Sequence, residues 1–310
     1  MNKCLYCYKN IEEENSFHPS CSKKIFGSAI PPVIDFTEEH LEGLATKLIQ
    51  SQAGVTGVQA KLSLNIQKER GQIDKLTIVD YYGGYILKPQ SNTYENLPEL
   101  EDLCMKMANQ SGIDVVPHSL IRLKSKQLAY ITKRIDREDG IKIPMEDMCQ
   151  LTERLTEHKY NGSHEQIAKV ILKFSENPLY DVQRFYEQVL FSYLIGNSDM
   201  HLKNFSIFKN KKLGYVLTPA YDMLSSLLVT KDNVELALAI NGKNNRITLN
   251  DFQIAMTTSG VKQNVIEKIF KRFSLLKTTW FDLIDNSFLP VEKQKRFKVL
   301  IDKKLSVFNI

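Results

Sequence analysis

Hydrophobic and polar positions follow two different periods in the two halves of the chain. Apolar residues alternate with polar ones over 61–66, and an apolar run at 85–88 follows a pair of glycines. Alternation at every second position predicts strands, and paired glycines predict the turns between them. Residues 119–123 and 128–132 have the pattern of a hairpin. The first half is therefore predicted to be rich in strands.

Helical spacing of apolar residues dominates after about residue 137. The clearest helix is expected at 181–195, where Asp181 is predicted to cap the first turn. The other expected elements are helices at 38–50, 99–109, 263–273, 278–286 and 291–307 and short strands at 205–208 and 215–218. The predicted fold class is α+β with two lobes, a strand-rich N-lobe at 29–135 and a helical C-lobe at 136–310.

Composition is that of an ordinary folded protein, because 43% of the 310 residues are hydrophobic and 25% are charged. The net charge of +5 is small for this length, and no basic stripe with interleaved aromatic residues indicates a nucleic-acid surface. No apolar run reaches the roughly 18 residues of a membrane-spanning helix. The N-terminus lacks the apolar core of a secretory signal. We therefore expect a cytoplasmic protein that does not contact a membrane.

The first 28 residues form a distinct segment with two pairs of metal-ligating residue types. Cys4 and Cys7 have Cys-x2-Cys spacing, and His18 and Cys21 follow after a ten-residue loop. Four such ligands can complete a tetrahedral zinc site. In a reducing compartment, metal binding is favoured over a disulfide for this pattern. The alternative is a short knuckle in which the same residues are small buried side chains.

The strongest chemical signal is a polar segment that follows the clearest predicted helix and contains Asp199 and Asn204. These two residues have Asp-x4-Asn spacing, and Asp222 comes after the second short strand. Phosphoryl transfer needs a group that orients the attacking hydroxyl and hard oxygen ligands that hold Mg²⁺. We assign Asp199 as the catalytic base or the group that orients the hydroxyl, and Asn204 and Asp222 as Mg²⁺ ligands.

Two further residues of this segment are candidates for catalysis. Lys203 could offset the charge of the transferred phosphoryl group, and His201 lies between Asp199 and Lys203. The spacing alone would also suit a polar loop whose Asp and Asn make turn hydrogen bonds. The kinase hypothesis gains from three upstream features, which stand in the same order as in protein kinases.

These features are a glycine-containing loop, a lysine and a glutamate. Glycines before a strand let backbone N–H groups approach phosphate oxygens. Lys88 ends an apolar strand and can reach nucleotide phosphates, and Glu101 on the next helix is its candidate ion-pair partner. The predicted nucleotide-binding residues of the loop and the following strand are Gly54, Val55, Thr56, Gly57, Val58, Gln59 and Lys61.

Together these motifs resemble the HipA family of bacterial toxin kinases. The resemblance is carried by residues 57–63, 136–137, 145–150, 194–206 and 217–222. It implies a protein-kinase-like fold that binds ATP and Mg²⁺ and phosphorylates a serine of a protein. An aminoacyl-tRNA synthetase is the implied target, and its modification inhibits translation. Lys88 would contact the ATP phosphates, the backbone near Lys133 and Ile135 would contact the adenine, and residues 147–150 would lie near the active site.

The chain is similar to the shorter HipT form, because only about fifty residues precede the glycine loop. That form implies two separate partners, a HipB-like helix-turn-helix antitoxin and a HipS-like small protein, with DNA reached only through the antitoxin. The family's autophosphorylated serine aligns with Gly54, which has no hydroxyl group. Thr56 and Ser51 are the remaining candidates for autophosphorylation in this loop.

Two other functions stay open at this point. Small-molecule kinases of the aminoglycoside type share the Asp-x4-Asn pattern, and an acidic drug pocket would favour them. A catalytically silent pseudokinase could serve as a module of an antitoxin complex, but the complete set of catalytic residue types argues against it. A serine/threonine-protein kinase toxin is therefore the predicted function.

Overall fold

The computed structural model describes residues 2–12, 15–37, 61–68, 71–79, 82–138, 140–230 and 234–308. The chain separates into two compact units, each of which is described by itself. Unit 1 comprises Met1–Asp102, Val116–Lys142 and Asn286–Phe288, and unit 2 comprises Leu103–Val115, Ile143–Asp285 and Leu289–Ile310. The predicted boundary lies at 135/136, and the structural one lies at 142/143. In the described ranges, no helix is both long and apolar enough to cross a bilayer.

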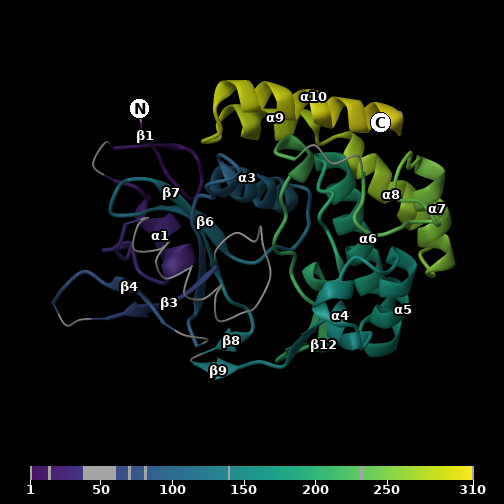
Figure 1. The fold of residues 1–310 in the computed structure, drawn as a ribbon, viewed down its shortest axis with the longest axis horizontal. Coiled ribbons are helices and arrows are strands. Elements are labelled where there is room, and N and C mark those ends of the chain that lie inside the picture. Colours follow the sequence, from purple (N-terminus) through teal and green to yellow (C-terminus); the bar gives the residue numbers. More distant parts are fainter. Residues whose placement is uncertain are drawn as a thin grey trace. The chain divides into compact units, whose positions relative to one another are not determined.

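Unit 1 is built on a five-stranded antiparallel sheet with the strand order β4-β3-β5-β7-β6 (Figure 1). The side chains of β3 and β5 that face the core, among them Leu64 and Leu87, are fully buried, as the alternation of apolar positions predicts. The predicted hairpin at 119–132 is confirmed by the pairing of β6 with β7. The strands are β3 (Leu62–Gln67), β4 (Lys75–Ile78), β5 (Tyr85–Lys88), β6 (His118–Arg122) and β7 (Leu128–Lys133).

A small knuckle packs on this sheet. It consists of the hairpin β1 (Asn2–Lys3) and β2 (Asn10–Ile11), followed by α1 (Pro19–Phe26). Proline at the first helical position suits a helix start, and Gly27 ends the helix in a left-handed conformation at φ 77°. Tyr85 of β5 donates a hydrogen bond of 3.1 Å to the Ile25 carbonyl, which ties α1 to the centre of the sheet.

The remaining elements of unit 1 follow the sheet in sequence. The helix predicted at 99–109 is α3 (Leu97–Gln110), and its last eight residues belong to unit 2. A short ribbon of β8 (Arg137–Glu138) and β9 (Ile141–Lys142) precedes unit 2. The helix predicted at 38–50 lies outside the described residues.

Unit 2 is mostly helical, as the spacing of its apolar residues predicts. Its helices α5 and α6 lie side by side (Figure 1), and α10 packs on α6 and α9. A three-stranded sheet, β10-β11-β12, pairs Asp147 with Ser206. The elements are β10 (Met145–Asp147), α4 (Met148–Leu151), α5 (His164–Phe174), α6 (Pro178–Ile195), β11 (Ser206–Asn210), β12 (Gly214–Leu217), α7 (Leu249–Thr258), α8 (Gln263–Ser274), α9 (Lys277–Asp285) and α10 (Val291–Val307).

The start of α6 differs from the prediction. The helix begins at Pro178, and Asn177 is its N-cap, so the prediction that Asp181 caps it is wrong. Asp181 is buried in the first turn, where it accepts hydrogen bonds from the Ser175 hydroxyl at 2.6 Å and the Leu217 N–H at 2.8 Å. Proline is favoured at the first helical position because its missing N–H is not needed there. Asp181 therefore joins α6 to β12 instead of capping the helix.

Candidate functional site

The predicted catalytic segment starts where α6 ends. Gly196 terminates the helix with φ 70°, a left-handed conformation that favours glycine. A Cβ atom at this position would lie 2.8 Å from a methyl carbon of Leu300 on α10. The next turn is held by Ser226, whose hydroxyl accepts a hydrogen bond of 2.7 Å from the Ser198 N–H. Helix packing and local hydrogen bonds therefore fix the path of the chain into Asp199.

Asp199 presents its carboxylate at the surface of unit 2. Its Oδ1 atom accepts a hydrogen bond of 2.6 Å from the Tyr160 hydroxyl. Its backbone N–H donates to the Asn197 side-chain oxygen at 3.3 Å. An accessible carboxylate held in one orientation suits a group that receives a proton from a substrate hydroxyl.

The two predicted Mg²⁺ ligands are neighbours in the structure. Asn204 Nδ2 donates to Asp222 Oδ2 at 3.2 Å, and Asn204 Oδ1 accepts from the His201 N–H at 3.1 Å. Asp222 has φ 59°, a conformation that non-glycine residues rarely adopt and that recurs at functional sites. The structure therefore brings a carboxylate and an amide together, although 17 residues lie between them in the sequence.

Lys203 has a specific partner in unit 2. Its Nζ atom lies 2.9 Å from Asp147 Oδ2 at the end of β10. Asp147 also caps α4, where it accepts the Gln150 N–H at 3.0 Å while the Gln150 side chain accepts the Asp147 N–H at 2.9 Å. Asp147, the first residue of the segment 147–150 that the resemblance places near the active site, therefore contacts Lys203.

His201 lies in the interior of the same segment. Its ring packs edge-on against Tyr160, with the ring centroids 5.2 Å apart. Burial and the charge of Lys159 lower the pKa of His201 to about 4, and the carboxylates of Asp199 and Asp222 only partly oppose this shift. At neutral pH the imidazole is therefore uncharged, and it supports Tyr160 by packing.

In unit 1, Lys88 and Glu101 form the predicted ion pair. Lys88 Nζ donates to Glu101 Oε1 at 2.6 Å, and both side chains are buried. The ammonium group also lies 5.5 Å from the centre of the Tyr130 ring on β7. A buried ion pair between a strand and the next helix is the arrangement that protein kinases use to hold their nucleotide-contacting lysine.

The family resemblance implies that the backbone near Lys133 and Ile135, at the end of β7 and just after it, contacts adenine. The Lys133 N–H donates to the Pro117 carbonyl at 2.8 Å, so this group is engaged within unit 1. Ile135 lies two residues after the end of β7 and is half-buried. Asp136 accepts from Arg134 and Arg137, each at 2.6 Å. Burial opposes ionisation of Asp136, but the hydrogen bonds and charges of these two arginines outweigh it and lower its pKa.

The predicted glycine loop and both autophosphorylation candidates lie outside the described residues. These residues are Ser51, Gly54, Val55, Thr56, Gly57, Val58 and Gln59. Lys61, the last of the predicted set, directly precedes β3 and is exposed. The loop prediction and both autophosphorylation candidates therefore stay predictions.

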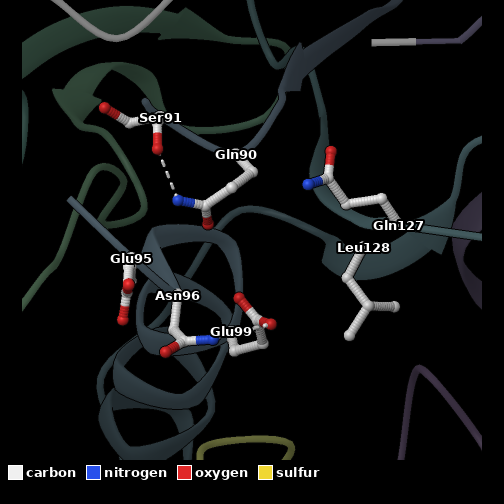
Figure 2. A pocket seen from close by; sticks show the side chains of 7 residues that line it. All are labelled: Gln90, Ser91, Glu95, Asn96, Glu99, Gln127 and Leu128. Carbon is white, nitrogen blue, oxygen red and sulfur yellow. Dashed lines mark hydrogen bonds between the residues drawn. The ribbon is translucent and has the colours of Figure 1, made fainter. Parts of the chain in front are cut away.

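A cavity of about 300 Å³ opens in unit 1 beside the start of α3. Figure 2 shows Gln90 and Ser91 on one side and Gln127 and Leu128 on another. Below them lie Glu95 and Asn96, which directly precede α3, and Glu99 in its first turn. Gln90 Nε2 donates to the Ser91 carbonyl at 2.6 Å. Of the predicted site residues that the structure describes, none lines this cavity, so it has no part in the site assigned from the sequence.

The four predicted zinc ligands come together in the knuckle of unit 1. One ligand atom from each of Cys4, Cys7, His18 and Cys21 lies within 4.8 Å of the other three. Cys4 and Cys21 are buried, and all five cysteines of the chain are free thiols. The four residue types are therefore clustered, and zinc binding itself stays a prediction.

Two tyrosines of unit 2 were missed from the sequence. Tyr160 follows a short helical turn and nothing in its local pattern marks it, because its role depends on Asp199, which lies 39 positions further along. Tyr221 donates to the Lys203 carbonyl at 3.1 Å and shares a 2.6 Å hydrogen bond with Ser206. Its place directly before Asp222 was the one available signal.

The fold is kinase-like, with a mixed sheet-and-helix architecture. The chain belongs to the HipA family, since the family model of the HipA-like C-terminal domain matches residues 53–280. Both the predicted family and the predicted α+β kinase-like fold class are confirmed.

Individual relatives agree with this assignment. A Haemophilus influenzae protein provisionally named as a kinase is 28% identical over 293 residues, with 84% of each chain covered. The Shewanella oneidensis serine/threonine-protein kinase toxin HipA is 25% identical over 67% of this chain and 51% of its own length. The chain thus spans most of the first relative and about half of the second.

Solved structures show the same fold. Shewanella oneidensis HipA, in a complex with HipB and operator DNA, matches with a TM-score of 0.68 at 20% identity over 83% of this chain and 65% of that chain. The Helicobacter pylori proinflammatory kinase CtkA matches with a TM-score of 0.54 at 14% identity over 72% of this chain and 87% of its own. At these identities, the likeness concerns the fold alone.

Proposed function

We propose that this chain is a serine/threonine-protein kinase that transfers the γ-phosphate of ATP to a serine of a protein. The observation that carries the proposal is the pairing of Asn204 with Asp222 at 3.2 Å, in the same unit as the exposed carboxylate of Asp199. The alternative is a polar loop held only by turn hydrogen bonds. Such a loop would not require Asp222 to adopt a left-handed backbone conformation and pair with the buried Asn204.

The donor set fits Mg²⁺. The Asp222 carboxylate and the Asn204 amide oxygen are hard ligands of the type that this ion prefers. Bound with ATP, Mg²⁺ would neutralise charge on the phosphate oxygens. Asn204 Oδ1 now accepts the His201 N–H, so a metal ion would compete with this hydrogen bond for the oxygen.

The residues of the chain have distinct roles in this proposal. Asp199 orients the serine hydroxyl and accepts its proton as the serine oxygen bonds to the γ-phosphorus. The bond from that phosphorus to the bridging oxygen breaks, and ADP leaves. Lys203, which pairs with Asp147, offsets negative charge near the reacting group. Lys88, which pairs with Glu101, contacts the phosphates of ATP.

The biological role proposed for the kinase is that of a toxin in a toxin–antitoxin system. Support comes from membership of the HipA family and from the HipA relative that is found with HipB on its operator DNA. We propose a HipB-like antitoxin and a HipS-like small protein as partners, with DNA reached through the antitoxin. The proposed target is an aminoacyl-tRNA synthetase, whose phosphorylation would stop translation.

The test is incubation of the purified chain with labelled ATP, Mg²⁺ and a bacterial lysate, followed by identification of the labelled residue. The active-site variant is Asp199→Asn, and Asp282→Asn, an exposed aspartate on α9, is the matched control. We expect labelled serine with the wild type and the control. With Asp199→Asn we expect none, although ATP binding is retained. Near wild-type transfer by Asp199→Asn would refute the assignment of the base.

Two other results would replace the proposal. Label on small molecules and not on proteins would make the chain a small-molecule kinase. ATP binding without transfer to any acceptor, in wild type and control alike, would make it a pseudokinase.

A further inference from the structure

The knuckle of unit 1 plays no part in the proposed phosphoryl transfer, yet it gathers four metal-ligating side chains. Cys4 and Cys7 lie in the β1–β2 turn, and Cys21 lies in the first turn of α1, three residues after His18. Their ligand atoms all lie within 4.8 Å of one another. In a tetrahedral site with Zn–S bonds of about 2.3 Å, sulfur atoms lie about 3.8 Å apart. The cluster therefore needs to contract by only about an ångström to close around an ion.

His18 is oriented as a ligand. Its Nδ1 atom faces the sulfurs of Cys7 at 3.4 Å and Cys21 at 3.8 Å, and its Nε2 atom lies 3.0 Å from the Asn10 carbonyl. A carbonyl can only accept a hydrogen bond, so Nε2 carries the proton and Nδ1 presents its lone pair to the cluster. Metal-bound histidines are typically held in this way by a carbonyl on the far nitrogen.

The burial of the cluster also favours a structural ion. Cys4 and Cys21 are buried and Cys7 is half-buried, so an ion between them would be shielded from water. Three sulfurs and one imidazole nitrogen are a donor set typical of structural zinc.

A chain of hydrogen bonds within unit 1 leads from the knuckle toward the Lys88–Glu101 pair. Tyr8, between the two ligand pairs, donates to Asp102 Oδ2 at 2.7 Å, and its N–H donates to the Cys4 carbonyl at 2.9 Å. Asp102 is fully buried, and its Oδ1 atom lies 2.7 Å from His118 Nδ1 on β6. Asp102 is the neighbour of Glu101 on α3. Tyr8 therefore connects the turn that carries Cys4 to Asp102, the residue next to Glu101 of the ion pair.

We infer that Cys4, Cys7, His18 and Cys21 bind one structural Zn²⁺, which fixes the knuckle and through Tyr8 holds the first turns of α3. Zinc binding releases the protons of the thiols and requires no oxidant or reductant. The site lies outside the residues proposed for phosphoryl transfer, so it is tested without an activity assay.

The first experiment measures metal in the full-length chain, purified under reducing conditions without chelator. We expect one zinc per chain by elemental analysis, and exchange with Co²⁺ should give the visible absorption of a tetrahedral thiolate site. Cys7→Ser should lose both signals, and Cys149→Ala, which removes a buried thiol of unit 2, should keep both. Absence of zinc and of a cobalt spectrum in the reduced wild-type chain would overturn the proposal, as would a disulfide among these cysteines in that sample.

The second experiment tests the link to α3 by hydrogen exchange before and after removal of zinc with a chelator. We expect at least tenfold faster exchange in residues 97–102 and 118–122, with helix α8 of unit 2 unchanged as the internal control. Tyr8→Phe should speed exchange in 97–102 while keeping its zinc. Unchanged exchange in α3 after zinc removal would refute the link, and a Tyr8→Phe variant that exchanges like the wild type would show that Tyr8 does not carry it.

Discussion

Tyr160 donates a hydrogen bond of 2.6 Å to the carboxylate of Asp199, from a loop 39 positions earlier in the chain. The Tyr160 ring is 47% exposed and rests edge-on against His201. The hydroxyl group therefore holds one oxygen of the proposed catalytic base and leaves the other for a substrate. Tyr160 is a positioning residue in this scheme, and its effect should be separable from that of the base.

Tyr160→Phe should lower kcat for phosphate transfer about five- to tenfold and leave KM for ATP unchanged. The variant keeps the ring against His201 and loses only a hydrogen bond worth about 1 kcal/mol, which corresponds to this change in rate. Steady-state kinetics on the phosphorylated protein, with ATP varied, is the measurement. A control is Tyr215→Phe, an exposed tyrosine on β12. A wild-type kcat for Tyr160→Phe would show that Asp199 needs no support from this hydroxyl.

Glu101→Gln should destabilise the chain by about 3 kcal/mol, because the variant leaves the buried ammonium of Lys88 without its counter-charge. Affinity for ATP should fall as well, since Lys88 would lose its fixed position. Urea unfolding and nucleotide titration measure the two effects. Asp35→Asn is the matched control, because it breaks the ion pair with Lys75, in which the side chains are 40% and 63% exposed.

An exposed pair of that kind contributes less than about 1 kcal/mol. Equal losses in the Glu101 and Asp35 variants would contradict the view that Lys88 depends on a buried partner.

Gly196→Ala should be strongly destabilising at the entry to the catalytic segment. The residue has φ 70°, and the added methyl would lie 2.8 Å from Leu300 and 3.3 Å from Leu227. Left-handed backbone alone costs about 1 kcal/mol for alanine, and overpacking adds about 1–3 kcal/mol. Gly242→Ala isolates the first of these costs, since Gly242 has φ 73° and no atom of the described residues would lie within 4 Å of its added methyl.

The free energy of unfolding of both variants, measured in urea, is the comparison. We expect Gly196→Ala to lose clearly more than Gly242→Ala, and a similar loss in both would mean that Leu300 moves aside at little cost.

His164 should make unit 2 sensitive to mild acid. The side chain is fully buried between Phe185 and Phe205, and burial lowers its pKa from 6.5 to about 3. Below pH 6.5 the unfolded chain binds a proton that the folded chain does not, so stability falls as the pH falls toward 3. Between pH 7.5 and 5.0 this residue alone removes about 2 kcal/mol.

His164→Leu removes the titrating group while keeping an apolar side chain in the core. The variant should lose about 2 kcal/mol less than the wild type between these two pH values in urea unfolding. His158→Leu, an exposed histidine in the turn before Tyr160, is the control and should leave the pH dependence as it is in the wild type. An unchanged pH dependence in His164→Leu would show that the imidazole is protonated in the folded chain.

Hydrophobic periodicity in the sequence predicted the strands β3, β5, β6 and β7 of unit 1 and the helices α6, α8, α9 and α10 of unit 2, but it did not predict α5 and α7. The order and spacing of polar residues predicted the residue types needed for kinase chemistry. The pairs Lys88–Glu101 and Asn204–Asp222 could be predicted because their members occur along the chain in the same order, and on the same kinds of element, as in protein kinases. The same holds for the cysteine and histidine cluster, since short spacing brings its members together within one small knuckle. These relationships depend on residue order or on short spacing along the chain, so they can be predicted from the sequence.

Tertiary structure alone decided the contacts between residues far apart in the chain. Tyr160 on Asp199, Asp147 on Lys203 and Tyr8 on Asp102 are hydrogen bonds between elements whose positions depend on packing of the whole unit. Asp181 shows the same limit, since the sequence favours it as a cap but the buried N–H of Leu217 binds it instead. A buried polar group must form a hydrogen bond with a group that is buried beside it. Which groups are buried together depends on the folded chain and not on the local sequence.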